Sequence, residues 1–246
     1  MAFRPVLNAA VVAGLIAGAV TTGFHWLFTE PVIDRAIQLE ERAREPGGSA
    51  TEPPVVDRRT QRRGLVVGFL VFGAVWGLLF GLLASRLLAW LPPVWPVAAR
   101  GVAAALLVGW SVSVMPFLKY PANPPGIGDP GSIGLRQQRY FGLVALSLAG
   151  TVLAAGLYRV LSRRHAPGGR MLPRARPAPA LIVLILYIGY AAVLYRLMPA
   201  NPDIATLPAD LVRAFRGTSL AGLVLFWVVL GGALGWLTRR AQPSAG

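Results

Sequence analysis

The sequence predicts an all-α membrane protein, a polytopic bundle of about six transmembrane helices with an interfacial amphipathic helix after the first span. Apolar residues make up 55% of the 246 residues, and charged residues only 14%. The apolar residues form long blocks, close to the ~20 residues that a helix needs to cross a bilayer. Arginines cluster at the ends of these blocks. This pattern is typical of membrane flanks and argues against nucleic-acid binding, despite a net charge of +14.

Six segments are long and apolar enough to be spans, and we expect the whole chain, 1–246, to form a single membrane domain. The first segment is longer than the apolar core of a secretory signal peptide, and no convincing cleavage site follows it, so we interpret it as a retained span. The predicted spans are 6–28, 64–85, 97–117, 140–161, 180–197 and 219–237.

The first loop holds seven of the chain's ten acidic residues, all between Glu30 and Asp57. Pro31 suits the first turn of a helix, and the apolar and acidic residues after it fall on separate faces. This pattern predicts an interfacial helix over 30–45. Its acidic face could concentrate cations, but a solvated helix face is the simpler interpretation. Proline, glycine and serine then predict a flexible linker over 46–60.

Glycines spaced four residues apart occur in several of the predicted spans. This spacing puts small residues on one helix face, where two backbones can approach closely in a membrane. It predicts tight helix–helix contacts, either within the chain or with a partner. The glycines concerned are Gly14, Gly18, Gly64, Gly68, Gly73, Gly77, Gly81, Gly231 and Gly235.

The string Pro-Ala-Asn-Pro occurs twice, at 121–124 and 199–202, each time after an apolar segment. A pair of arginines three residues apart follows each copy and leads into the next span. The chain therefore contains two predicted repeat units, 97–161 and 180–237, in parallel orientation, as in one class of transporters. We expect these residues to shape the loops: Lys119, Pro121, Pro124, Arg136, Arg139, Pro199, Pro202, Arg213 and Arg216.

Six spans place both Asn-Pro loops on the same membrane face, since successive spans alternate in direction. Basic residues are spread over both faces, so the positive-inside rule does not favour a cytoplasmic N-terminus. We place the N-terminus inside, and the two loops outside, only because the basic loop after the fourth span has no acids. Each proline restricts the asparagine before it to an extended conformation, and an Asx-turn is the simpler role for such an asparagine. Two copies together, with Asp203 and Asp129, offer oxygen ligands for a divalent cation.

His25 lies near the end of the first span, on the same predicted face. It is either an interfacial residue among aromatic neighbours or an imidazole ligand for Co²⁺ or Ni²⁺. The candidate metal ligands are therefore His25, Asn123, Asn201 and Asp203. Met115 and Met198 precede prolines at span ends, and we expect them to fill apolar space, with soft metal ligation as the alternative.

Several devices that drive transport or catalysis are absent from the sequence. No acidic residue lies in the centre of a predicted span, and there is no Gly-rich phosphate loop. No nucleophile–base arrangement is present, so we expect a non-enzyme without a cofactor. A lipid-modifying enzyme that uses arginines to hold head-group phosphate ranks last. A passive path for an ion, or a subunit that depends on a partner, fits better.

Three strings carry a resemblance to a known family: Thr29-Glu30-Pro31-Val32-Ile33, Lys119-Tyr120-Pro121-Ala122-Asn123-Pro124-Pro125 and Pro199-Ala200-Asn201-Pro202-Asp203. With their order along the chain, they resemble the CbtA family of cobalt transporter subunits from bacterial inner membranes. The resemblance implies Co²⁺ uptake linked to cobalamin synthesis, and a small single-span CbtB partner with a histidine-rich tail. It implies no ligand set. Membrane lipid is the other expected partner. The alternative function is a non-transporting scaffold that holds another membrane protein.

Overall fold

The computed structural model describes residues 3–43, 57–92, 94–125, 127–128, 130–164, 177–201 and 207–240. Across this described part the chain is helical and contains no β-strand. Six helices are long and apolar enough to cross a membrane, which confirms the predicted fold class. The α-helices are α1 (Phe3–Phe28), α2 (Glu30–Ala43), α3 (Arg58–Trp90), α4 (Val97–Gly109), α5 (Met115–Lys119), α6 (Ile133–Arg164), α7 (Pro177–Leu197) and α8 (Ala209–Arg240).

Three of the helices begin earlier than their apolar segments. α6 and α8 include the arginine-rich turns before the predicted spans at 140 and 219. Arginine favours helix and has a long stem that keeps its charge in the interfacial water, so the helix continues past the apolar block. α3 begins at Arg58, so the linker predicted over 46–60 is wrong for 58–60, and 46–56 lies outside the described residues.

Asp57 caps the first turn of α3. Its Oδ1 accepts the backbone N–H of Thr60 at 2.7 Å and so satisfies one of the donors that a helix start leaves unpaired. The side chain and backbone of Thr60 hold the pKa of the Asp57 carboxyl below its ordinary value, because their hydrogen bonds favour the charged form. This cap explains why the helix starts immediately after Asp57.

The third span is a continuous helix with one wide turn. α4 passes into the π-helical turn η1 (Trp110–Val114), which passes into α5. Pro116 has no N–H, and its ring clashes with the carbonyl four residues earlier in a regular α-helix. A π-turn relieves this clash by widening the helix just before the proline. The wide turn therefore follows from the Met115-Pro116 string.

The chain forms two compact units, which are described separately. Unit 1 contains α1, α2, α3, α4 and α8 together with the segment Ala122–Gly128. Unit 2 contains η1, α5, α6 and α7, and it ends at Pro202. The first Asn-Pro segment thus belongs to unit 1, and Asn201 to unit 2.

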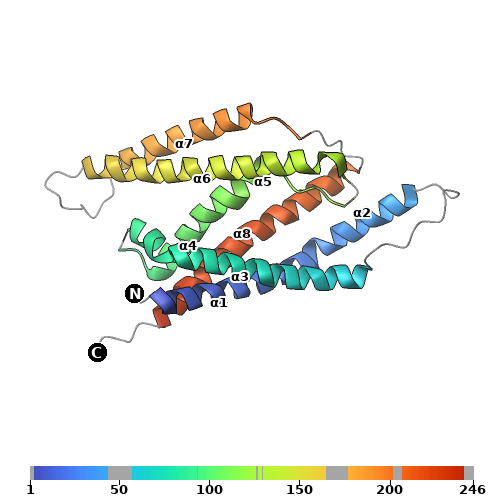
Figure 1. The fold of residues 1–246 in the computed structure, drawn as a ribbon, viewed down its shortest axis with the longest axis horizontal. Helices are drawn as coiled ribbons and strands as arrows, with labels where there is room; N and C mark the ends of the chain where they lie inside the picture. Colours follow the sequence, from blue (N-terminus) through green and yellow to red (C-terminus); the bar gives the residue numbers. More distant parts are fainter. Residues whose placement is uncertain are drawn as a thin grey trace. The chain divides into compact units, whose positions relative to one another are not determined.

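In unit 1, α1 lies alongside α3, and α4 alongside α8 (Figure 1). Glycines allow these pairs to touch through their backbones. A Cβ on Gly14 would collide with the carbonyl oxygen of Gly73, and a Cβ on Gly101 would lie 2.6 Å from the carbonyl oxygen of Gly231. The predicted glycine contacts are therefore confirmed within the chain. Gly68 differs, because a Cβ there would meet no atom within 4 Å.

Aromatic rings connect α3 to α8 inside the same unit. Phe72 and Phe226 meet edge to face at 5.0 Å between ring centroids, and Trp76 and Trp227 do so at 5.1 Å. Gly109 gives Trp227 room, since a Cβ there would overlap the indole ring. Edge-to-face pairs of this kind stabilise by roughly 0.5–1.5 kcal/mol each beyond the area they bury.

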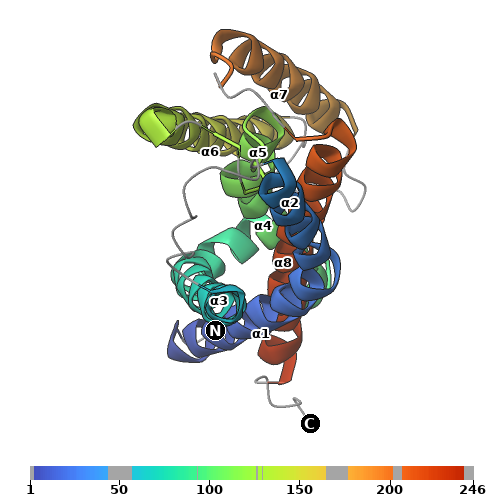
Figure 2. The same cartoon turned by 90° about the vertical axis from the view of Figure 1, so that its right-hand side faces the viewer.

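In unit 2, α6 and α7 run alongside one another (Figure 2), and η1 and α5 pack against α6. The core of this unit contains Met115 and Leu143, both fully buried, with Tyr120 and Leu194. Several further tyrosines pack around it. Unit 2 therefore has a core that is rich in hydroxyl groups, although its helices lie in the membrane.

Candidate functional site

His25 is buried near the end of α1, with 8% of its surface exposed. Its Nδ1 shares a hydrogen bond with Thr29 Oγ1 at 2.8 Å, and its ring stacks on Phe69 of α3 at 4.9 Å. A Cβ on Gly222 of α8 would collide with Nε2, so this nitrogen faces bare helix backbone. His25 is therefore an interior residue of unit 1, where α1 packs against α3 and α8, rather than a member of an interfacial aromatic belt.

The acidic face of α2 is paired with arginines at the start of α3. Glu30 Oε2 accepts hydrogen bonds from Arg58 at 2.8 Å and from Arg62 at 2.9 Å. Asp34 accepts from the same two arginines at 2.6 and 2.7 Å. The solvated-face interpretation is wrong for these two carboxylates, and the Glu30 side chain is only 6% exposed. Because the arginines neutralise them, this pair does not concentrate cations.

The first Asn-Pro segment is held by the N-terminal turns of α8. Arg216 Nη2 donates a hydrogen bond to Asn123 Oδ1 at 2.9 Å, within unit 1. Pro124 is fully buried, while Arg213 is exposed. The oxygen of Asn123 thus already has a cationic partner, which lowers its capacity to attract a metal ion.

The second Asn-Pro segment is held through its backbone. Arg139 Nη1 donates to the carbonyl oxygen of Ala200 at 2.6 Å, and the Tyr120 hydroxyl donates to that of Pro199 at 2.7 Å. Lys119 Nζ donates to the carbonyl oxygen of Tyr195 at 2.8 Å. Burial raises the pKa of Tyr120, and the charge of Arg139 opposes the shift. The hydroxyl therefore keeps its proton at neutral pH and stays a donor.

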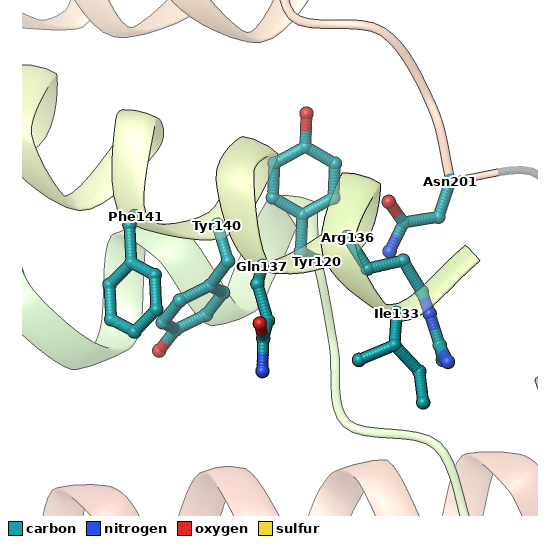
Figure 3. Close-up of a pocket in the computed structure, with 7 residues that line it drawn as sticks. All are labelled: Tyr120, Ile133, Arg136, Gln137, Tyr140, Phe141 and Asn201. Atoms are coloured by element: carbon teal, nitrogen blue, oxygen red, sulfur yellow. The ribbon is translucent and has the colours of Figure 1, made fainter. Parts of the chain in front are cut away.

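Asn201 lines an open pocket of about 310 Å³ in unit 2. Its Oδ1 is buried and has no hydrogen-bond partner in the described part of the chain. Figure 3 shows the Asn201 amide beside the side chains of Arg136 and Tyr120. An acceptor that is buried without a partner costs roughly 1–3 kcal/mol, and such an atom is available to a cation or a donor ligand. The remaining lining residues are Ile133, Gln137, Tyr140 and Phe141.

The two segments are held in corresponding ways. Arg216 and Arg139 occupy equivalent places in the predicted repeat, and each contacts the Asn-Pro segment that belongs to the other repeat unit. The asparagines differ: Asn123 Oδ1 has an arginine partner, whereas Asn201 Oδ1 has none. Pairing of the two segments at one site stays a prediction. Pro202, Asp203 and Asp129 lie outside the described residues.

No cluster of three or more histidines and carboxylates gathers anywhere in the described ranges. The predicted ligands His25 and Asn123 share unit 1, and Asn201 lies in unit 2. A tight resident metal site needs several charged or imidazole ligands converging on one point. The described residues contain no such convergent set.

Unit 2 contains a buried polar network that was not predicted from the sequence. The sulfur of Met115 accepts a hydrogen bond from the Ser147 hydroxyl at 3.0 Å and another from Tyr187 at 3.5 Å. Met115 is fully buried, as expected of an apolar filler, but its sulfur has polar partners. The expectation that it only fills space is therefore incomplete.

The network continues through two further hydroxyls. Tyr187 accepts the indole N–H of Trp110 at 2.7 Å and lies 3.2 Å from Thr151 Oγ1. Thr151 in turn accepts from Ser111 at 2.8 Å. Serines and threonines in the middle of spans, near a Met-Pro string, are the sequence signal for this network. Only the fold shows that they face one another.

Six spans define a multi-pass membrane protein. A sequence model of one family, described as "Probable cobalt transporter subunit (CbtA)", matches residues 3–239. The chain belongs to this CbtA family. No curated protein and no solved structure gives a match. The family is a class of transport subunits rather than enzymes, and the word subunit implies a complex.

Proposed function

We propose that this chain is the membrane subunit through which Co²⁺ enters a bacterial cell across the inner membrane to supply cobalamin synthesis. The ion enters near the Asn-Pro segments, and the chain works with a small single-span subunit of the CbtB kind. The observation that carries the entry site is the buried Asn201 Oδ1, which lies in the pocket of unit 2 without a partner. Membership of the CbtA family supports the choice of ion.

An amide carbonyl oxygen is a suitable first contact for Co²⁺. It is neutral, so it replaces one water of the hydrated ion without holding the ion too tightly to leave. Arg136 lines the same pocket and repels a cation. In water, unit charges about 4 Å apart interact by about 1 kcal/mol, and the value doubles for a divalent ion. This repulsion weakens binding without preventing passage.

The other proposed ligands are Asp203, Asn123 and His25. Asp203 follows Asn201 by two residues and supplies a negative charge against the surrounding arginines. Asn123 retains a second lone pair beside the one that faces Arg216. His25 contributes Nε2, the nitrogen that faces Gly222. Because spans alternate in direction, the loops after the third and fifth spans share one face of the membrane, which the proposal requires.

The test is uptake of radiolabelled Co²⁺ by cells that express the chain with its partner at equal membrane levels. The variant is Asn123→Ala with Asn201→Ala, which removes both amides from the Asn-Pro segments. The matched control is Asn8→Ala, because Asn8 is exposed in α1 and is the only other asparagine in the sequence. We expect uptake by the double variant to fall about tenfold, the effect of losing roughly 1.4 kcal/mol of contact. Unchanged uptake would remove the loops from the mechanism.

Arg136→Gln tests the charge at the pocket. If Co²⁺ contacts Asn201, removing the nearby positive charge lowers the Co²⁺ concentration that gives half-maximal uptake by a few-fold at low ionic strength. The difference shrinks in high salt, because salt screens the interaction. An increase in that concentration would mean that Arg136 supports the ion rather than repels it, and that the pocket takes an anion.

The alternative, a scaffold for another membrane protein, is favoured by one observation. Gly64 and Gly68 stand four apart on α3, and a Cβ on either would meet no atom within 4 Å. Such a surface suits close approach of a second helix. A scaffold predicts that Gly64→Leu with Gly68→Leu abolishes co-purification of the single-span partner. It also predicts that wild-type cells show no Co²⁺ uptake above cells that lack the chain.

A further inference from the structure

We infer that the buried hydroxyl–thioether network of unit 2 is the point inside the membrane where the divalent ion contacts the protein. We call the set Met115, Ser147, Thr151 and Tyr187 the thioether rung. The inference rests on the proposed function and deepens it, because it names a second contact beyond the entry pocket. Of its members, only Met115 was considered as a soft metal ligand from the sequence, and there as the alternative to filling apolar space.

Three of the four residues of the thioether rung lie near the middle of membrane-spanning segments, and Met115 lies near the end of the span Val97–Lys119. Ser147 and Thr151 are near the middle of the span Ile133–Ser162, and Tyr187 is at the middle of the span Ala178–Leu197. Both Ser147 and Met115 are fully buried. A neutral polar cluster at this depth is expensive unless its members bond to one another, and such groups often mark the paths of solutes.

One face of α6 leads from the entry pocket to the rung. Tyr140 lines the pocket, and Ser147 follows seven residues later, which is two helical turns or about 10 Å. Leu143 lies between them on the same face and is fully buried. Tyr140 packs against the same core cluster as Met115. An ion that passed from the pocket to the rung along this face would have to displace the Leu143 side chain.

The donor atoms of the rung match a borderline divalent ion. Soft thioether sulfur discriminates against Mg²⁺, which prefers oxygen ligands only, and favours later transition metals. The hydroxyls of Ser147 and Tyr187 can rotate, so that their lone pairs rather than their protons face an ion beside the sulfur. The O–H···S contacts that are lost are weak hydrogen bonds, so the exchange costs little.

The thioether rung carries no charged side chain, which suits passage of an ion better than tight binding of it. A site that holds an ion with carboxylates and imidazoles binds it tightly and releases it slowly, whereas conduction needs weak contacts. The π-helical turn beside the rung supplies Trp110 and Ser111 to the network. Turns of this type occur frequently at functional sites, because they break the regular backbone ladder where a ligand must approach.

In a purely structural network the sulfur only accepts weak hydrogen bonds, whereas in the proposed site it is also a metal ligand. Met115→Leu separates the two accounts, since leucine fills a similar volume and such swaps usually cost less than about 1.5 kcal/mol. Met198→Leu is the matched control. Met198 also packs against this core, and no hydroxyl contact to its sulfur is found among the described residues.

The first measurement is radiolabelled Co²⁺ uptake in cells that carry each variant with the partner subunit. We expect Met115→Leu to lower uptake about tenfold and Met198→Leu to lower it less than about twofold. Excess Mg²⁺ should compete with Co²⁺ in Met115→Leu and not in the wild type, because the soft ligand has been lost. Equal uptake and equal Mg²⁺ competition in the two variants would overturn the inference.

The second measurement is a spectrum of the purified full chain. The chain has no cysteine, so Met115→Cys introduces the only thiol, and a thiolate bound to Co²⁺ gives a charge-transfer absorption band. Ala191→Cys is the control, because Ala191 packs against the same core from α7. We expect the band in Met115→Cys alone. No band in Met115→Cys, or equal bands in both variants, would contradict the inference.

The two proposals fail in different ways. If wild-type cells take up no more Co²⁺ than cells without the chain, the proposed function is wrong. If the wild type transports Co²⁺ and Met115→Leu transports it equally well, only the thioether rung is wrong.

Discussion

Different interactions hold the helices together inside each of the two units of this protein. In unit 1 the helices touch backbone to backbone at glycines, as at Gly14 and Gly73 and at Gly101 and Gly231. In unit 2 they are joined by hydroxyl groups and a methionine sulfur, with Tyr187 and Met115 at the centre. Both solutions suit a membrane, where lipid offers little hydrophobic drive for helix association.

The difference bears on what each unit can do. A backbone contact cannot be relieved by rotating a side chain and requires movement of a whole helix. We therefore expect glycine packing to make unit 1 rigid. A hydrogen-bonded network can exchange partners when a side chain rotates, which the proposed contact with an ion in unit 2 requires. The expectation is that packing changes damage unit 1 most, whereas loss of single polar atoms changes transport through unit 2.

Gly14→Val should have the largest effect on stability. Its added Cβ would collide with the Gly73 backbone, which no rotamer change relieves. We expect a loss of at least about 3 kcal/mol, seen as little folded protein by size-exclusion chromatography in detergent. Gly68→Val is the matched control, since the position is open. If both variants fold equally well, unit 1 is not held by backbone contact.

Glu30→Gln should have an intermediate effect. The Glu30 side chain is 6% exposed and bonds to Arg58 and Arg62, whose side chains are 33% and 39% exposed. Water screens the arginines, so we expect a loss of about 1–2 kcal/mol rather than the larger loss of a fully buried pair. Thermal unfolding in detergent measures it. The control Glu41→Gln, at an exposed position, should change stability by less than about 0.5 kcal/mol.

Tyr187→Phe should destabilise least of the three. It leaves the Trp110 indole N–H without its acceptor, and intramembrane hydrogen bonds contribute roughly 1 kcal/mol or less. Tyr190→Phe is the comparison, because that hydroxyl donates only to a helix carbonyl at Leu146. A loss near that for Gly14→Val would show that unit 2 is as rigidly determined as unit 1.

Much of the fold follows from the sequence, because spans are fixed by local composition. Six apolar blocks gave six helices, and glycine spacing predicted tight helix–helix contacts, which occur between α1 and α3. Helix starts were less predictable. α3 and α6 begin within polar sequence, at Arg58 and Ile133. For α3, the cap at Asp57 rather than hydrophobicity decides where the helix begins.

The site was less predictable than the fold. Local sequence marks Asn123 and Asn201 as equivalent, yet their surroundings differ, since only Asn123 has an arginine partner. The sequence showed the hydroxyl residues and Met115 of the thioether rung but not that they meet. It depends on Met115 and Tyr187, which are 72 residues apart, facing one another, and no local pattern encodes such a meeting.

The central claim is that the unpaired oxygen of Asn201 in unit 2 contributes more to entry of the ion than the arginine-bound oxygen of Asn123 in unit 1. Radiolabelled Co²⁺ uptake by the two single variants, Asn201→Ala and Asn123→Ala, tests this claim most directly at equal expression. We expect Asn201→Ala to lower uptake about tenfold and Asn123→Ala to lower it about threefold or less. Equal losses, or a larger loss for Asn123→Ala, would contradict the account.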